Sequence, residues 1–134
     1  MQVLFQSIYS KFTGSTGAGS LHALLGGRLH LGKAPQGSTY PYGVYREISD
    51  VPEYVFGTTN LEHTLIQFNL YDDDNSATDI NAVYTALTSL YDHAAMTVST
   101  GYSSVIIERE FSYLSRGETL WDYNIRYRFI LQKN

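Results

Sequence analysis

The chain has 134 residues, the usual size of one small domain, and a formal net charge of −4 at pH 7. Its nine Lys and Arg residues are scattered, so they do not form the dense basic patch of a protein that binds nucleic acid by neutralising phosphates. The absence of cysteine excludes disulfides and thiolate metal sites. No stretch approaches the ~20 apolar residues of a membrane span, so we expect no membrane partner.

Two short helices are predicted at the start of the chain. Apolar residues at helical spacing predict a helix over residues 2–12, with Phe5, Ile8 and Phe12 facing inward. Gly and Ser fill five of the eight positions 13–20, which predicts a loop within the domain. The next helical edge consists of Leu21, Leu24 and Leu25. The glycines at 26–27 are expected to end this helix, and residues 28–31 to run extended.

A long hairpin follows a crossing that Pro35 and Pro41 fix. Residues 42–56 and 60–71 read as its two antiparallel strands, and apolar and polar residues alternate in the second. Because Pro52 cannot donate to a ladder, residues 50–57 are expected at an edge, a bulge or the protruding tip.

The best helix signal is a stripe over residues 80–91, formed by Ile80, Val83, Tyr84, Leu87, Leu90 and Tyr91. Ser76 and Asp79 resemble a capping box at its start. The acidic run at 72–74 lies just upstream, where a helix dipole favours negative charge. We expect the stripe to pack on the sheet.

The last third of the chain reads as a second long hairpin, with strands 102–114 and 119–133 and a turn at 115–118. Alternation in the final strand places Trp121, Tyr123, Ile125, Tyr127, Phe129 and Leu131 on one face. The elements together predict one α+β domain over residues 1–134, with a mostly antiparallel sheet, long hairpins and helices packed on one face.

The chain contains residues that could bind a metal, but their spacing argues against a metal-binding site. The histidines at 22, 30, 63 and 93 have no HxH or HExxH spacing. Asp72, Asp74 and Ser76 imitate the first half of a calcium loop, but Ala77 replaces its glycine and Val83 its bidentate Glu. We therefore expect no metal or cofactor, and leave open whether a divalent cation binds near residues 72–74.

Catalytic patterns are also weak. The glycines form neither a P-loop nor a dinucleotide fingerprint, and no serine stands in a GxSxG setting. Glu108 and Glu110 could act as an acid–base pair in principle, but salt bridges across a sheet explain them better. We expect no enzymatic activity.

Three segments carry a resemblance to a known family: GGR at 26–28, APQGSTYPYGVY at 34–45 and LIQFNLYDDD at 65–74. In these motifs and in the order of its elements, nearly the whole chain resembles the tail-completion or tail-terminator proteins of long-tailed bacteriophages and prophages. Members of that family are minor tail proteins of the virion neck. The resemblance implies a structural virion protein that forms a ring, commonly hexameric, on top of the tail tube.

Such a ring stops tail polymerisation and presents a head–tail joining surface to the head-side connector. The implied partners are other copies of the chain, the tail-tube protein and the connector or head-closure protein, with DNA only as cargo passing through the lumen. The chain would be cytoplasmic in the host before assembly.

Candidate contact residues follow from predicted exposure rather than from a family motif. They are Val51, Pro52, Tyr54 and Phe56 at the first hairpin tip, and Arg116 at the second turn. Two alternatives stay open. Another neck or tail subunit, such as a head-closure or tail-tube protein, would share these features. A small enzyme would need a convergent polar pocket, for example Glu108, Glu110 and a histidine around one cleft.

Overall fold

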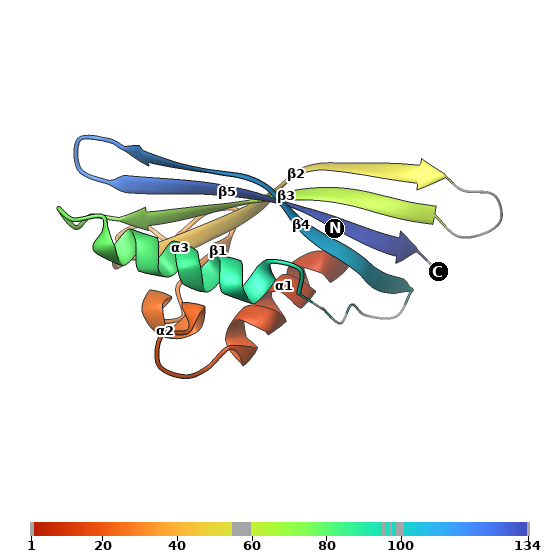
Figure 1. The fold of residues 1–134 in the computed structure, drawn as a ribbon, viewed down its shortest axis with the longest axis horizontal. Helices are drawn as coiled ribbons and strands as arrows, with labels where there is room; N and C mark the ends of the chain where they lie inside the picture. Colours follow the sequence, from red (N-terminus) through yellow and green to blue (C-terminus); the bar gives the residue numbers. More distant parts are fainter. Residues whose placement is uncertain (1, 55–59, 95, 97, 99–100, 134) are drawn as a thin grey trace.

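The computed structural model describes residues 2–54, 60–94, 96, 98 and 101–133. These residues form a five-stranded sheet in the order β1-β2-β3-β5-β4, with three helices on one of its faces (Figure 1). β1 pairs with β2 in parallel, and every other neighbouring pair is antiparallel. The predicted α+β fold with a mostly antiparallel sheet is confirmed.

The elements in chain order are α1 (Gln2–Gly14), α2 (Leu21–Leu25), β1 (Leu29–Leu31), β2 (Tyr42–Tyr54), β3 (Asn60–Asp72), α3 (Thr78–Tyr91), β4 (Tyr102–Arg116) and β5 (Trp121–Lys133). Each corresponds to a predicted element. The turn predicted at 115–118 is wrong, because β4 continues through Arg116 in register with Trp121. The connection therefore occupies residues 117–120.

The stripe on α3 packs against the apolar face of the sheet, as predicted. Ile80, Val83, Leu87 and Tyr91 are buried on the helix side, and Phe68 and Tyr127 are buried on the sheet side. The rings of Tyr91 and Phe68 lie 5.1 Å apart, and the Tyr84 ring stacks on that of Tyr123 at 4.1 Å. The predicted alternation of β5 is confirmed by burial at Ile125, Tyr127, Phe129 and Leu131.

The first helix is rotated from its predicted orientation. Its buried side chains are Leu4, Ser7, Ile8 and Phe12, whereas Phe5 is only partly buried at the rim of the core. Phe5 instead makes an edge contact with the ring of Tyr45. The helix also extends two residues into the predicted loop.

Helix ends differ between α2 and α3. Ser20 caps α2, since its hydroxyl accepts a hydrogen bond from the Ala23 N–H at 3.2 Å, and Gly26 ends it with φ at 58°, in the left-handed region. The capping box predicted for α3 is wrong. Its N-cap is Ala77, which has no side-chain cap, and Ser76 instead accepts a hydrogen bond from the Thr78 N–H.

Candidate assembly surfaces

The β2–β3 hairpin extends beyond the helices, and we define its outer part, residues 49–54 and 60–65, as the arm (Figure 1). The β3 strand of the arm also pairs with residues 128–133 of β5. A bulge between Glu47 and Ser49 marks its base. All described β2 residues of the arm are exposed, with exposed fractions of 57% for Val51 and 78% for Tyr54. Residues 50–57 were expected at an edge, a bulge or the protruding tip. Residues 50–54 lie at an edge, since β1 pairs with β2 only at residues 43–45, and the bulge comes before them.

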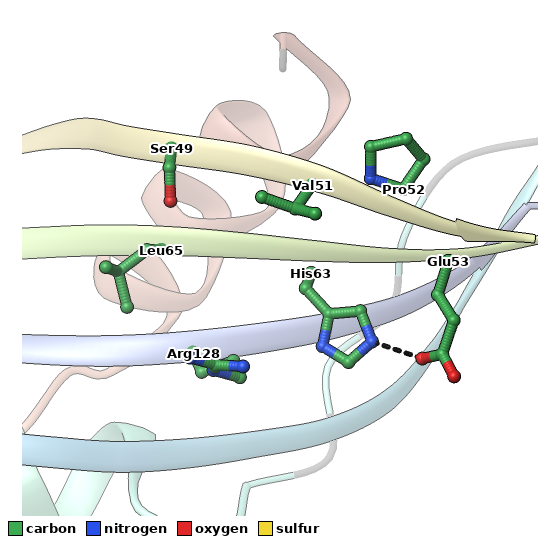
Figure 2. A pocket seen from close by; sticks show the side chains of 7 residues that line it. All are labelled: Ser49, Val51, Pro52, Glu53, His63, Leu65 and Arg128. Carbon is green, nitrogen blue, oxygen red and sulfur yellow. Dashed lines mark hydrogen bonds and ion pairs between the residues drawn. The ribbon is translucent and has the colours of Figure 1, made fainter.

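A shallow groove of about 370 Å³ runs along one face of this arm (Figure 2). The lining residues are Ser49, Val51, Pro52, Glu53, His63, Leu65 and Arg128. His63 Nε2 lies 2.7 Å from Glu53 Oε2, and this contact is an ion pair when His63 is protonated. The described hydrogen bonds of His63 do not include one to Ser49, so these side chains do not form a Ser–His–Glu triad.

The opposite face of the arm is acidic. Burial raises the pKa of Glu62, and the neighbouring Asp50 carboxylate raises it further. Thr64 donates a hydrogen bond to Asp50 on the same face. The His63–Glu53 pair lies on one face of the arm and Asp50 and Glu62 lie on the other, so the two faces differ chemically.

The sheet face without helices carries a buried polar network that the sequence did not indicate. The predicted alternation of β3 puts Gln67 and Asn69 on this face, opposite the apolar residues, but their exposed fractions are only 6% and 7%. Gln67 Nε2 donates to Asn69 Oδ1 at 2.8 Å and to Asn124 Oδ1 at 3.1 Å, and Arg126 donates to Gln67 Oε1 at 2.9 Å. This network joins β3 and β5 through side chains, in addition to the backbone hydrogen bonds between the two strands.

Of the two acidic residues of β4, Glu110 forms a salt bridge, as predicted, whereas no salt bridge of Glu108 is found among the described residues. A bulge between Arg109 and Phe111 places Glu110 against Arg128, with which it makes a hydrogen-bonded ion pair. Arg109 pairs with Asp92 at 3.3 Å beyond the end of α3. Neither Glu108 nor Glu110 lines the groove that contains His63, so the acid–base constellation considered from sequence is not assembled.

Arg116 is held within its own subunit. Its guanidinium lies 4.8 Å from the centre of the Trp121 ring and donates to the Asp74 carbonyl oxygen at 2.9 Å. Trp121 Nε1 donates to the same oxygen at 2.9 Å. The second hairpin thereby fastens the loop that enters α3.

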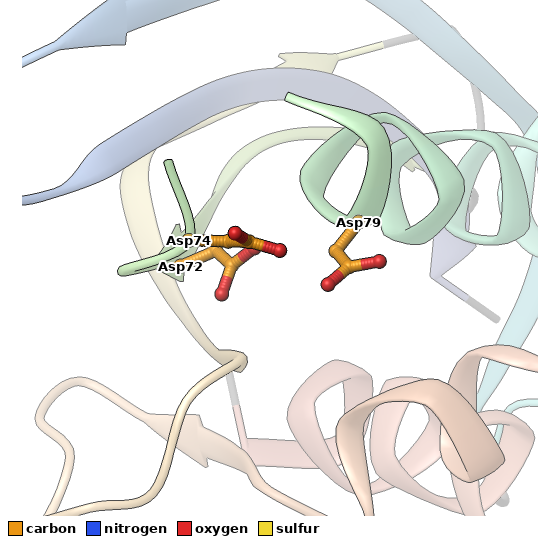
Figure 3. Close-up of side chains that lie close together, drawn as sticks. All are labelled: Asp72, Asp74 and Asp79. Carbon is orange, nitrogen blue, oxygen red and sulfur yellow. The ribbon is translucent and has the colours of Figure 1, made fainter. Parts of the chain in front are cut away.

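Three carboxylates gather at that loop: Asp72 at the end of β3, Asp74 in the loop and Asp79 in the first turn of α3 (Figure 3). Burial raises the pKa of Asp72. The backbone N–H groups of Asp74 and Asp73 lower this pKa through hydrogen bonds, and repulsion by the carboxylates of the same two residues raises it. A hydrogen bond with the Asp74 side chain raises the pKa of Asp79.

The residues predicted for partner contacts lie at opposite ends of the sheet (Figure 1). Val51, Pro52 and Tyr54 are exposed on the arm, with Val51 on the groove face. Phe56 lies outside the described residues. Arg116 is exposed at the other end, within the contacts given above.

No protein-family model matches the chain, and no curated protein matches its sequence. Its fold is similar to that of a chain in the solved structure described as "Virion of native gene transfer agent (GTA) particle". The TM-score is 0.74 at 15% sequence identity, and the match covers 98% of this chain and 96% of that chain. The likeness establishes the fold over nearly the full length of both chains. None of the described helices is long and apolar enough to cross a bilayer.

Proposed function

We propose that this chain is a structural subunit of a phage-like virion, and that a ring of its copies closes the head-proximal end of the tail tube. The observation that carries the proposal is the near-complete match in fold to a chain of a gene transfer agent virion. The sequence resemblance to tail-terminator proteins supports the same role.

Free strand edges on both sides of the sheet could join neighbouring copies. β1 pairs with β2 only at residues 43–45, so the arm part of β2 has β3 as its one strand partner among the described residues. On the other side of the sheet, the strand partner of β4 is β5. A contact between the β2 edge of one copy and the β4 edge of the next is heterologous, and such contacts close into a ring when the rotation between copies is suitable.

The arm supplies the apolar part of this proposed contact. Val51 and Tyr54 are strongly exposed and stand beyond the core of their own subunit, where a neighbour can bury them. Pro52 and Phe56 stay part of the proposed interface. Arg116 is proposed to contact a neighbour or the tail tube with the part of its side chain that remains exposed.

The proposed partners are further copies in a hexameric ring, the tail-tube protein and the head-side connector, with DNA as passing cargo. The subunit would wait in the host cytoplasm and end in the virion neck. The role is non-enzymatic. The groove residues His63 and Glu53 pair with each other rather than with a nucleophile, which supports this proposal.

Deleting the gene from the phage or prophage that encodes the chain tests the role. Electron microscopy of the resulting particles should show overlong or headless tails. A complete absence of tails would assign the chain to the tube instead. Particles with heads and normal tails would refute the proposal.

Charge placed on the arm tests the interface separately. Tyr54→Asp should fold normally, because the side chain is 78% exposed, and should fail to enter particles. Thr16→Asp introduces the same charge at an exposed loop position and should be incorporated like wild type. Equal incorporation of the two variants would remove Tyr54 from the interface.

A further inference from the structure

The carboxylates of Asp72, Asp74 and Asp79 lie close together at the loop before α3 (Figure 3). Each offers one oxygen, and these oxygens lie within 4.8 Å of one another. Two ligands of one Ca²⁺ ion, each at about 2.3–2.6 Å, are at most about 5 Å apart. The spacing is therefore compatible with Ca²⁺.

A second observation is the state of Asp72. This side chain is 3% exposed, and its Oδ2 atom is buried without a hydrogen-bond partner. The backbone N–H groups of Asp73 and Asp74 already donate to the carboxylate, so its remaining oxygen is the orphan. A buried carboxylate oxygen without a partner is strongly unfavourable, and a cation next to it removes the deficit.

Among the described residues, none of the charges that act on Asp72 and Asp79 is positive. Those on Asp72 are the charges of Asp74 and Asp73, and those on Asp79 come from Asp74 and Asp72. The nearby Arg116 guanidinium donates to the backbone carbonyl of Asp74. The three carboxylates thus lie close together as like charges.

The loop is also held in place for binding. Arg116 and Trp121 both donate to the Asp74 carbonyl oxygen at 2.9 Å, which ties the loop to the β4–β5 hairpin. Because the backbone of the loop is already fixed, its carboxylates would lose less conformational entropy on binding an ion.

We propose that Asp72, Asp74 and Asp79 bind one Ca²⁺ ion, which joins the end of β3 to the start of α3. Carboxylate oxygens are the ligands that this hard cation prefers, and water completes its coordination on the exposed side of Asp74 and Asp79. The site is not an EF-hand. With three carboxylates, its dissociation constant is expected in the weak range of about 10⁻⁴–10⁻³ M.

Terbium luminescence tests the proposal directly, because the chain has a single tryptophan and Trp121 is hydrogen-bonded to the loop. Tb³⁺ added to the protein and excited through Trp121 should give saturable emission that Ca²⁺ displaces. Asp79→Asn should weaken Ca²⁺ binding at least about tenfold; its side chain is exposed, so the fold is retained. Ca²⁺ at ten times its dissociation constant should raise the melting temperature of the wild type by about 5 °C, and the rise for Asp79→Asn at that concentration should be at most about 1.5 °C.

Asp73→Asn is the matched control, since it removes the same charge from an exposed carboxylate outside the three. Its affinity for Ca²⁺ should change less than about twofold, the effect expected for an exposed, solvent-screened charge. Equal loss in the two variants would mean general attraction of cations to an acidic loop and would overturn the site. The same conclusion would follow if Ca²⁺ up to 10 mM, about ten times the upper expected dissociation constant, neither displaced Tb³⁺ nor raised the melting temperature.

Discussion

Replacing Tyr91 by phenylalanine removes one hydroxyl from the centre of the core. This hydroxyl donates to the Ile8 carbonyl oxygen at 2.8 Å and joins α3 to α1, and the side chain is fully buried. The net loss is about 1 kcal/mol for one such hydrogen bond. With an unfolding entropy of about 0.28 kcal/mol/K for a chain of this size, the melting temperature should fall by about 4 °C at neutral pH.

The same substitution should have the opposite effect in strong alkali. Burial raises the pKa of Tyr91 above its ordinary value of 10.0, so above pH 10 the unfolded chain loses this proton while the folded chain keeps it. The stability linked to the raised pKa is present below pH 10 and declines at higher pH by about 1.4 kcal/mol per unit. Phenylalanine has no such dependence, so Tyr91→Phe should match the wild type near pH 11 and exceed it above.

Urea unfolding at pH 8, 10 and 11.5, followed by circular dichroism, measures both effects. Tyr45 and Tyr127 also have raised pKa values, but they contribute equally to both proteins. Tyr113→Phe is the control, because its side chain is 59% exposed, and its free energy of unfolding should follow the wild type throughout. A difference between Tyr91→Phe and wild type that stays constant from pH 8 to 11.5 would refute the reasoning.

Three further substitutions test the core, a helix end and the loop anchor by chemical denaturation. Leu87→Ala should lower the free energy of unfolding by about 2–5 kcal/mol, because the side chain is fully buried. Asn81→Ala, at an exposed position on the same helix, should lower it by less than about 0.5 kcal/mol. Similar losses in the two variants would contradict the packing of α3. Gly26→Ala should destabilise the protein by about 1 kcal/mol, because the φ angle of Gly26 is 58°. Gly14→Ala is the control and should not destabilise the protein, because the added Cβ would meet open space. Arg116→Ala should cost about 1 kcal/mol and change the emission of the single tryptophan, and an unchanged spectrum would contradict the stacked geometry.

Sequence periodicity predicted the helices and strands that bury only one of their faces. The α3 stripe and the alternation of β5 were identified because each repeats the same side-chain pattern over twelve or more residues. In α1 the pattern was ambiguous. Both Leu4 and Phe5 fit an apolar stripe, and only the position of the sheet decides that Leu4 is the buried one.

The loop before α3 shows why its contacts could not be derived from sequence. The acidic residues were visible, but Asp74 is 42 residues from Arg116 and 47 from Trp121, which bind its carbonyl oxygen. Local signals also misplaced the second turn, because Ser115 and Arg116 are compatible with a turn and the β5 register keeps them in the strand. Burial of Gln67 and Asn69 likewise depends on side chains from neighbouring strands.

Image reconstruction of particles from the encoding phage is the most direct test of the proposed role. It should place copies of this chain in one closed ring at the head-proximal end of the tail, with the β2 arm of each copy against the β4 edge of the next. Density for the chain repeated along the tube, or particles that lack it, would contradict the proposed role.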